Sequence, residues 1–271
     1  MKPAPEARRP SPLTRKTWQR LLVVAYFLVC TAYVACFTWL FLMPRYRREQ
    51  TGARYGLPGW IWLTNAMLFG ARGRLLGAEH LPAVRRGFIY IANHESVADI
   101  WLLMHFLRPG FLMKKSLLAL PVGWGAYLSG SVGVQRADKQ NRARSLEETV
   151  EMSWRSTAVV VFPEGTFGHS DGRLLEPHLN LLRRAYDAGL AIVPLGHAGC
   201  RRAINGDALP IWRGAETVLV VRPMLWPANF PSREAFAHAC WAEVIRGVRA
   251  ARREISAGCP YAADPAPGVA D

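Results

Sequence analysis

Residues 88–103 read FIYIANHESVADIWLL and combine two kinds of regular structure in one short run. The first five residues are apolar and mostly aromatic or β-branched, which predicts a buried strand that ends at Ala92. Ser96 and Asp99 stand three positions apart before an apolar run. This is the pattern of a capping box and predicts a helix that begins at Ser96. His94 therefore lies in a tight turn between a strand and a helix, beside the helix N-terminus.

The alternation of strand and helix continues outward from this unit. Short apolar runs rich in valine and isoleucine predict further strands that are buried on both faces. The stretches between them have helical spacing. We therefore predict an α/β fold, a layered domain around a central, mostly buried sheet. The predicted strands cover residues 88–92, 131–135, 158–162, 191–195 and 217–221, and the predicted helices cover residues 96–107, 139–154, 174–188 and 232–254.

The N-terminal part of the chain has a different composition. Residues 21–43 carry no charged side chain, and a helix of this length reaches roughly 34 Å, enough to cross a hydrocarbon core of about 30 Å. Basic residues flank this run on both sides, and a second apolar stretch at 57–70 is too short to span. We expect two apolar helices that enter one leaflet and leave both ends in the cytosol, in preference to a single span.

These patterns predict the organisation of the whole chain. The α/β domain is preceded by a hydrophobic, membrane-anchoring helical segment and flanked by two polar tails. The predicted parts are a disordered basic tail over 1–20, membrane-anchoring helices over 21–72, the α/β domain over 73–256 and a disordered tail over 257–271.

The formal net charge of +14 at pH 7 predicts an anionic partner. An anionic membrane surface agrees with the apolar N-terminus. Nucleic acid is not predicted, because the chain has no zinc-finger spacing, no basic region followed by heptads and no aromatic RNA-binding signature. The five cysteines include no CxxC pair, so neither a disulfide framework nor a zinc site is predicted. Four histidines lack metal-ligand spacing and receive no role, namely His169, His178, His197 and His238.

The turn that holds His94 has the residues for base catalysis. Asp99, in the first helical turn, can fold back and hydrogen-bond one ring nitrogen of His94. The tautomer is then fixed, and the other nitrogen is left as a base. Taken alone, the pattern suits an ordinary capped helix with a histidine in its turn better than it suits a catalytic pair.

A second segment with polar residues at the end of a strand is VVVFPEGTFGHSDG, residues 159–172. Glu164, Gly165 and Thr166 follow the predicted strand directly. In open α/β sheets ligands bind at this edge, and a carboxylate with a hydroxyl can hold a polyol-like acceptor. Taken alone, this segment also suits an ordinary turn with a solvated glutamate.

Together the two segments resemble the glycerophospholipid acyltransferases, typified by lysophosphatidic acid acyltransferase. The four blocks of that family appear in order. The stretch between the first two blocks, with Lys114 and Lys115 before Pro121, also resembles the family. The blocks are the H-x-x-x-x-D pattern at 93–99, a glycine, short strand and arginine at 130–136, F-P-E-G-T at 162–166, and an apolar stretch around a proline at 192–196.

The resemblance implies a reaction. His94, oriented by Asp99, takes the proton from an acceptor hydroxyl, and the oxygen attacks an acyl thioester without an acyl-enzyme. The donor is acyl-CoA or acyl carrier protein, and the acceptor is a lysophospholipid or another lysolipid. No metal and no further cofactor are implied. The implied location is the membrane, at the cytoplasmic face of the inner (plasma) membrane.

The resemblance also implies the acceptor site. Glu164, Gly165 and Thr166 are expected to bind the acceptor. Arg136, with Lys114 or Lys115, is expected near the phosphate of the acceptor.

One position departs from the family pattern. Phe167 stands where the family usually has an arginine after F-P-E-G-T. A phenyl ring cannot bind phosphate, so we expect an acceptor other than lysophosphatidate, such as a lyso-ornithine lipid, or a replacement of the missing cation by Arg173.

Two other functions compete with acyl transfer. The sequence 168–172 fits G-x-S-x-G, the nucleophile elbow of serine esterases and lipases, with Ser170 as the nucleophile. That elbow needs a strand directly before it, whereas the predicted strand ends at Phe162. A non-enzymatic binder of the membrane surface would explain the charge and the apolar N-terminus, but it leaves the His94 turn and the F-P-E-G-T segment unexplained.

Overall fold

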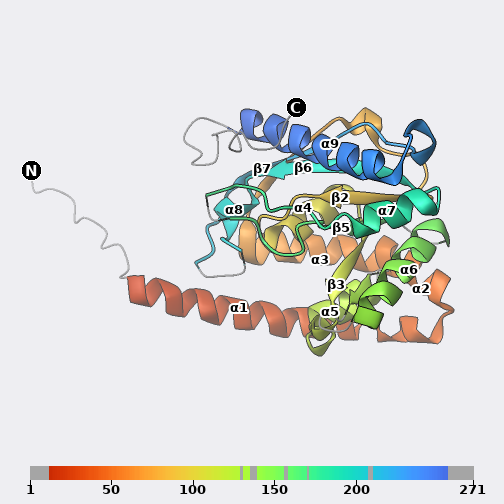
Figure 1. The fold of residues 1–271 in the computed structure, drawn as a ribbon. Coiled ribbons are helices and arrows are strands. Elements are labelled where there is room, and N and C mark those ends of the chain that lie inside the picture. Colours follow the sequence, from red (N-terminus) through yellow and green to blue (C-terminus); the bar gives the residue numbers. More distant parts are fainter. Residues whose placement is uncertain are drawn as a thin grey trace, which may run out of the picture.

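A seven-stranded sheet forms the centre of the molecule (Figure 1). The computed structural model describes residues 12–128, 131–134, 139–155, 158–169, 171–206 and 210–255. The strand order is β1-β7-β6-β2-β5-β3-β4, and neighbours are parallel except β6 and β7, which are antiparallel. The strands are β1 (Arg72–Leu76), β2 (Phe88–Ala92), β3 (Gly110–Lys114), β4 (Val132–Val134), β5 (Val159–Val161), β6 (Ala191–Ala198) and β7 (Glu216–Val221).

Helices cover both faces of the sheet. In β2, Phe88 and Tyr90 pack in one cluster with α4 (Ala98–Phe106), whereas Ile89 and Ile91 pack in a second cluster with α9 (Arg233–Glu254). Alternate residues of a strand point to opposite faces, so a strand buried on both sides needs apolar residues throughout. The layers are completed on the α9 side by α6 (Lys139–Arg155) and α7 (Asn180–Asp187). The predicted α/β fold with a buried central sheet is confirmed.

The five predicted strands and four predicted helices are all present, with shifted ends. Two strands escape the sequence pattern. Strand β1 reads RGRLL and lies at the edge of the sheet, where partial exposure tolerates charge. Strand β3 is a short run that begins at Gly110, directly after Pro109. Helix α7 begins at Asn180 rather than at 174, because Pro177 disfavours helical backbone in the residue before it.

The N-terminal helices form an antiparallel hairpin. Helix α1 (Pro12–Ala35) is followed by a turn, and the chain then returns alongside it. The Tyr26 hydroxyl lies 2.9 Å from Thr64 Oγ1, and the Tyr33 hydroxyl donates to the Gly56 carbonyl at 2.7 Å. Residues later in α1 therefore contact residues earlier in the returning arm, as in an antiparallel pair. The turn and the returning arm consist of η1 (Thr38–Leu42), α2 (Arg45–Thr51), the π-helical turn η2 (Gly52–Gly56), α3 (Leu57–Thr64) and the π-helical turn η3 (Asn65–Phe69).

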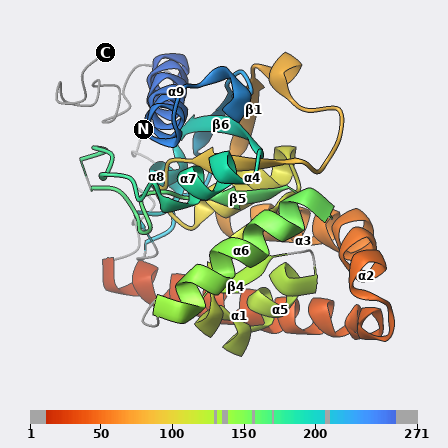
Figure 2. The same ribbon diagram turned by 45° about the vertical axis from the view of Figure 1, so that its right-hand side comes forward.

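This hairpin shares its core with the α/β domain. Cys30 and Ile61 belong to the same buried cluster as Trp101 of α4. Figure 2 shows α5 (Pro121–Leu128) beside α1. One stretch, Thr17–Leu42, is long and apolar enough to cross a membrane, and most of it is exposed. The predicted apolar N-terminal segment is therefore present as a helix.

Part of the predicted basic tail is helical. Helix α1 begins at Pro12, so the expected disorder of residues 1–20 is wrong for 12–20. The Gln19 side chain donates to the Ile211 carbonyl at 2.8 Å and accepts from the Ile211 N–H at 3.2 Å, which ties this part of the helix to the domain. Residues 1–11 and the predicted tail 257–271 lie outside the described residues. The domain boundaries stay a prediction.

The remaining short helices connect the main elements. They are η4 (Ala78–His80), η5 (Lys115–Ala119), α8 (Cys200–Ala203) and η6 (Pro227–Asn229).

Candidate active site

The candidate site lies at the carboxyl ends of three adjacent parallel strands. His94 follows β2, Glu164 follows β5, and Lys114 is the last residue of β3. The register pairs Tyr90 with Val160, so the two chain segments that continue past β2 and β5 emerge side by side. This edge is where open α/β sheets bind ligands. Arg136, which is expected at the same edge after β4, lies outside the described residues.

His94 and Asp99 form a hydrogen-bonded pair. His94 Nδ1 donates to Asp99 Oδ2 at 2.8 Å. The Asp99 side chain is fully buried, and that of His94 is 15% exposed. Because a carboxylate only accepts, the proton of neutral His94 sits on Nδ1, and Nε2 keeps a lone pair that can act as a base. The predicted base and orienting group are thus brought together.

Asp99 also holds the backbone that leads into the helix, although the helix has Val97 at its N-cap position and no side-chain cap. Its Oδ2 atom accepts from the backbone N–H of Glu95 at 2.6 Å and of Ser96 at 3.0 Å. Ser96 Oγ in turn accepts from the Ala98 N–H at 3.2 Å, and regular helix begins at Ala98. Burial alone would raise the pKa of Asp99, but His197, His94 and the Ser96 N–H together hold that pKa below its usual value.

The loop after β5 forms hydrogen bonds with both backbone polar groups of His94. Glu164 Oε1 accepts from the His94 N–H at 2.8 Å, and Glu164 Oε2 accepts from the Leu175 N–H at 2.7 Å. The Gly168 N–H donates to the His94 carbonyl at 2.8 Å. Gly165 makes this tight path possible, because its φ of 70° suits a residue without a side chain. Burial raises the pKa of Glu164 to about 7.

Glu164 therefore has a role that the sequence does not predict. The expected role is contact with the acceptor. In the structure the carboxylate is buried and each oxygen holds a backbone N–H, one of them that of the candidate base. Direct binding of the acceptor by Glu164, Gly165 and Thr166 stays a prediction; Thr166 is exposed and Gly165 is partly exposed at the site.

Two aromatic rings enclose the imidazole of His94. Phe162 stacks on it with ring centroids 3.9 Å apart and planes inclined by 9°. Phe167 lies against it with centroids 4.5 Å apart and an inclination of 56°. The Phe167 ring also packs over Gly206, where an added Cβ would approach it to 3.3 Å. These contacts restrict the ring of His94, and neither was visible in the sequence, because each depends on how two loops meet.

The cations of the site are exposed. Lys114 and Lys115 lie at the end of β3 with their side chains in solvent. Arg173, the sequence-based replacement for an arginine at 167, donates through Nε to Asp171 Oδ2 at 2.7 Å, and both side chains are more than half exposed. Its charge is thus already paired within its own loop.

The serine-hydrolase alternative lacks its structural context. Ser170 itself lies outside the described residues. Strand β5 ends at Val161 and the next helix of the described chain begins at Asn180, so no strand runs directly into this segment and no helix directly out of it. A nucleophile elbow requires both.

An apolar cavity of about 520 Å³ lies between the N-terminal hairpin and the α/β domain. Its walls come from α1, the returning arm of the hairpin, α4 and β3. Val97, which also lines it, stands three residues after His94. Residues that represent these walls are Tyr26, Phe27, Trp60, Ile100, Met104 and Met113.

The α/β fold with the His94–Asp99 pair at the carboxyl edge of its sheet defines a class of protein, and known proteins resemble this chain in sequence and in fold. The sequence profile described as Acyltransferase matches residues 74–198. The 1-acyl-sn-glycerophosphate (LPA) acyltransferase from Thermotoga maritima has a structure similar to this one, with a TM-score of 0.67 and 25% identity over 89% of this chain and 99% of that one. The sequence and the fold of the chain thus resemble those of the glycerophospholipid acyltransferases.

Two curated relatives differ in their named acceptors. A 1-acyl-sn-glycerol-3-phosphate acyltransferase from Chlamydomonas reinhardtii is 29% identical over 155 residues, which cover 56% of this chain and 46% of that protein. A lyso-ornithine lipid O-acyltransferase from Pseudomonas aeruginosa is 32% identical over 114 residues, 42% of this chain and 43% of that protein. The chain spans about half the length of the curated relatives that it matches.

Proposed function

We propose that this protein transfers a fatty acyl group from a thioester donor to the hydroxyl of a lysolipid. The observation that carries the proposal is the pair of His94 and Asp99, held by hydrogen bonds on both sides beside an apolar cavity. The similarity to known proteins supports it, because the relatives are named as acyltransferases that act on lysolipids.

The geometry supports general-base catalysis. His94 Nε2 takes the proton of the acceptor hydroxyl while that oxygen attacks the thioester carbonyl carbon. The tetrahedral intermediate collapses, the C–S bond breaks, and the thiolate leaves with the proton from the imidazolium. The negative charge of Asp99 stabilises the imidazolium between these steps, and Phe162 keeps the ring in place. The products are an acylated lipid and a free thiol.

The cavity supports a long acyl chain as the transferred group. Its volume lies within the range of about 300–1,000 Å³ that is usual for ligand sites, and its walls are apolar. Burial of methylene groups there would stabilise a bound chain by about 0.8 kcal/mol for each group. Because Val97 stands on the cavity side of the His94 turn, the chain would run beneath α4 while its carbonyl carbon stays near His94.

The acceptor is proposed to lack a phosphate monoester. A lysophosphatidate head carries nearly two negative charges and needs several charged donors. In this chain Phe167 occupies the position of the usual arginine and packs on His94, and Arg173 is paired with Asp171. Lyso-ornithine lipid, the acceptor named for the relative from Pseudomonas aeruginosa, has no phosphate and needs no such donors. Arg136, Lys114 and Lys115 would then contact other parts of the acceptor or the donor.

The proposed location is the membrane, with the α/β domain on the cytoplasmic side. The antiparallel hairpin brings its own two ends, the start of α1 and the start of the α/β domain, to the same side. Large apolar side chains of the hairpin are exposed in this structure and would be buried in lipid. They include Leu21, Val24, Leu28, Phe41, Leu42 and Trp62.

An assay of thiol release tests the proposal. Purified protein is mixed with long-chain acyl-CoA or acyl carrier protein, with and without lysophosphatidate or lyso-ornithine lipid. We expect release only when a lysolipid is present. Release without any lysolipid would indicate a thioesterase instead, and no release with any pair of substrates would favour a binder of the membrane surface.

A further inference from the structure

His197 is a fully buried histidine next to the candidate base. It lies on β6, whose register with β2 pairs Leu195 with Ala92 and so brings residue 197 beside the His94 turn. Strand β2 ends at Ala92, and beyond it the Asn93 side chain makes the hydrogen bonds to the backbone of β6 that a further strand residue would make. Its amide donates to the His197 carbonyl at 3.0 Å, and its oxygen accepts from the His197 N–H at 2.9 Å.

The ring of His197 completes this clamp. Nε2 lies 2.7 Å from the backbone carbonyl oxygen of Asn93. That oxygen can only accept a hydrogen bond, so Nε2 carries a proton. The other ring nitrogen, Nδ1, is buried and has no hydrogen-bond partner among the residues that the structure describes. The ring is therefore held through Nε2 alone. His197 thus acts as a fixed donor.

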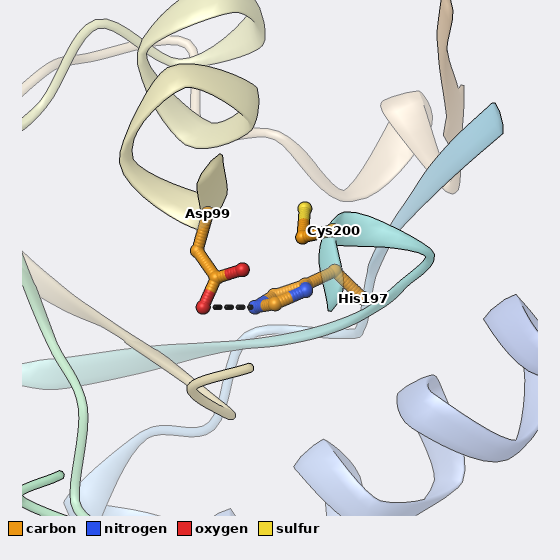
Figure 3. Close-up of side chains that lie close together, drawn as sticks. All are labelled: Asp99, His197 and Cys200. Atoms are coloured by element: carbon orange, nitrogen blue, oxygen red, sulfur yellow. Dashed lines mark ion pairs between the residues drawn. The ribbon is translucent and has the colours of Figure 1, made fainter. Parts of the chain in front are cut away.

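The same N–H lies beside the orienting carboxylate. His197 Nε2 is 3.7 Å from Asp99 Oδ2, the oxygen that accepts from His94 (Figure 3). Both side chains are fully buried, so the attraction between the N–H dipole and the carboxylate is little screened by water. Asp99 therefore lies between two histidines: His94, which is partly exposed, and His197, which is fully buried.

Asp99, His197 and Cys200 also place three possible metal ligands within 4.8 Å of one another (Figure 3). Their contacts argue for a hydrogen-bonded network rather than a metal site. The His197 Nε2 proton points to the Asn93 carbonyl, and Asp99 Oδ2 already accepts from His94. Burial raises the pKa of the Cys200 thiol well above its usual value, so it stays protonated, whereas a metal binds the thiolate.

We propose that His197 is a positioning residue of the acyl transfer, which fixes the turn that carries His94 and supplies a permanent N–H dipole to Asp99. This inference rests on the proposed function. Without that dipole, the Asp99 charge would be less satisfied and would favour the protonated, inactive form of His94. The turn would also lose one of the three hydrogen bonds between Asn93 and His197.

A matched pair of variants tests the proposal. The Nε2 amide of glutamine can reach the place of the imidazole Nε2, whereas methionine has a similar shape and no donor. We expect His197→Gln to keep kcat within about threefold of wild type and His197→Met to lower kcat roughly tenfold with little change in the KM for either substrate. We also expect the acid limb of the pH–rate profile of His197→Met to move to higher pH by roughly half a unit or more.

The shift of the acid limb distinguishes loss of the His197 donor from a defect in core packing. A packing defect would lower activity and thermal stability but would leave the acid limb of the pH–rate profile in place. Other charged or titratable groups near Asp99 are the same in all variants, so they cancel in the comparison. These groups are Glu95, Glu164, Cys200, Arg201 and Arg252.

The outcomes separate this inference from the proposed function. If His197→Met does not fold, His197→Asn replaces it, because its shorter amide does not reach the Asn93 carbonyl. Wild-type kcat and an unmoved acid limb in His197→Met or His197→Asn would overturn the inference, and so would a His197→Gln variant as impaired as His197→Met. Activity that survives His94→Ala would instead overturn the proposed function.

Discussion

The turn after β2 and the loop after β5 meet at the site, but they differ in how firmly hydrogen bonds and burial fix their side chains. In the turn, Asp99 accepts from a ring nitrogen and from two backbone N–H groups, and the backbone of His94 is bonded on both sides. The loop gives its buried carboxylate, Glu164, to the turn and leaves Thr166 exposed and Phe167 partly exposed. From this difference we propose that the turn provides the chemistry and the loop provides the selectivity.

This comparison predicts that changes in the turn act on kcat and changes in the loop act on the choice of acceptor. Apart from His94 itself, the largest effect is expected at the orienting carboxylate. Asp99→Asn should lower kcat by about 10²-fold, because an amide does not enforce the proton on His94 Nδ1 and does not stabilise an imidazolium. Asp171→Asn is the matched control in an exposed loop. Steady-state kinetics check both, and an Asp99→Asn variant within about threefold of wild type would contradict the role of the turn.

The next effect is expected at Phe167, where the loop departs from its relatives. Phe167→Arg should raise the affinity for lysophosphatidate by about 10–100-fold, because one charge-assisted hydrogen bond is worth about 1.5–3 kcal/mol. Side-by-side assays with lysophosphatidate and lyso-ornithine lipid measure this change. Arg173→Ala is the control and should leave the acceptor preference unchanged. A wild type that strongly prefers lysophosphatidate, with no change in Arg173→Ala, would show that Phe167 does not set the acceptor.

Glu164 links the two regions, and its replacement should have an intermediate effect. Glu164→Gln should lower kcat by roughly tenfold, because the amide nitrogen cannot accept one of the two backbone N–H groups. Glu176→Gln, an exposed glutamate of the same loop, is the control.

The raised pKa of Glu164 also predicts a dependence of stability on pH. The folded state keeps its proton up to about pH 7, whereas the unfolded state loses it near pH 4.3, so folding binds a proton between these values. The stability of the wild type should therefore fall as pH rises from about 4.3 to 7, and Glu164→Gln should show a smaller fall. Thermal unfolding across this range measures the difference, and identical profiles would mean that Glu164 does not titrate there.

The smallest effect is expected at Ser170. Ser170→Ala should leave acyl transfer within about twofold of wild type, because β5 ends well before this residue. A fluorophosphonate probe should not label the wild type. Loss of activity together with labelling of Ser170 would favour the serine hydrolase.

The sequence predicts the site best where the interactions are local. The strand at 88–92, the hydrogen bond from the Ser96 N–H to Asp99 and the position of His94 all depend on residues within a dozen positions. All are found as expected, although regular helix begins at Ala98 and not at Ser96. The F-P-E-G-T segment is also placed correctly, at the same edge of the sheet.

Long-range contacts were beyond the sequence. His197 and Asn93 are 104 residues apart, so no spacing rule connects them, and His197 received no role from its sequence context. The stacking of Phe162 on His94 and the use of Glu164 as a backbone acceptor depend in the same way on two loops that meet only in the fold. Strand β1 was missed because its charged residues are tolerated only at a sheet edge.

The central claim is that His94 is the base of a lysolipid acyltransferase, and one comparison tests it most directly. Thiol release in the presence of lysolipid is measured for wild type, His94→Ala and His169→Ala, an exposed histidine of the neighbouring loop. We predict that His94→Ala loses about 10²–10⁴-fold in kcat while its melting temperature stays near that of wild type, and that His169→Ala keeps full activity. A folded His94→Ala variant with wild-type, lysolipid-dependent release would contradict the account.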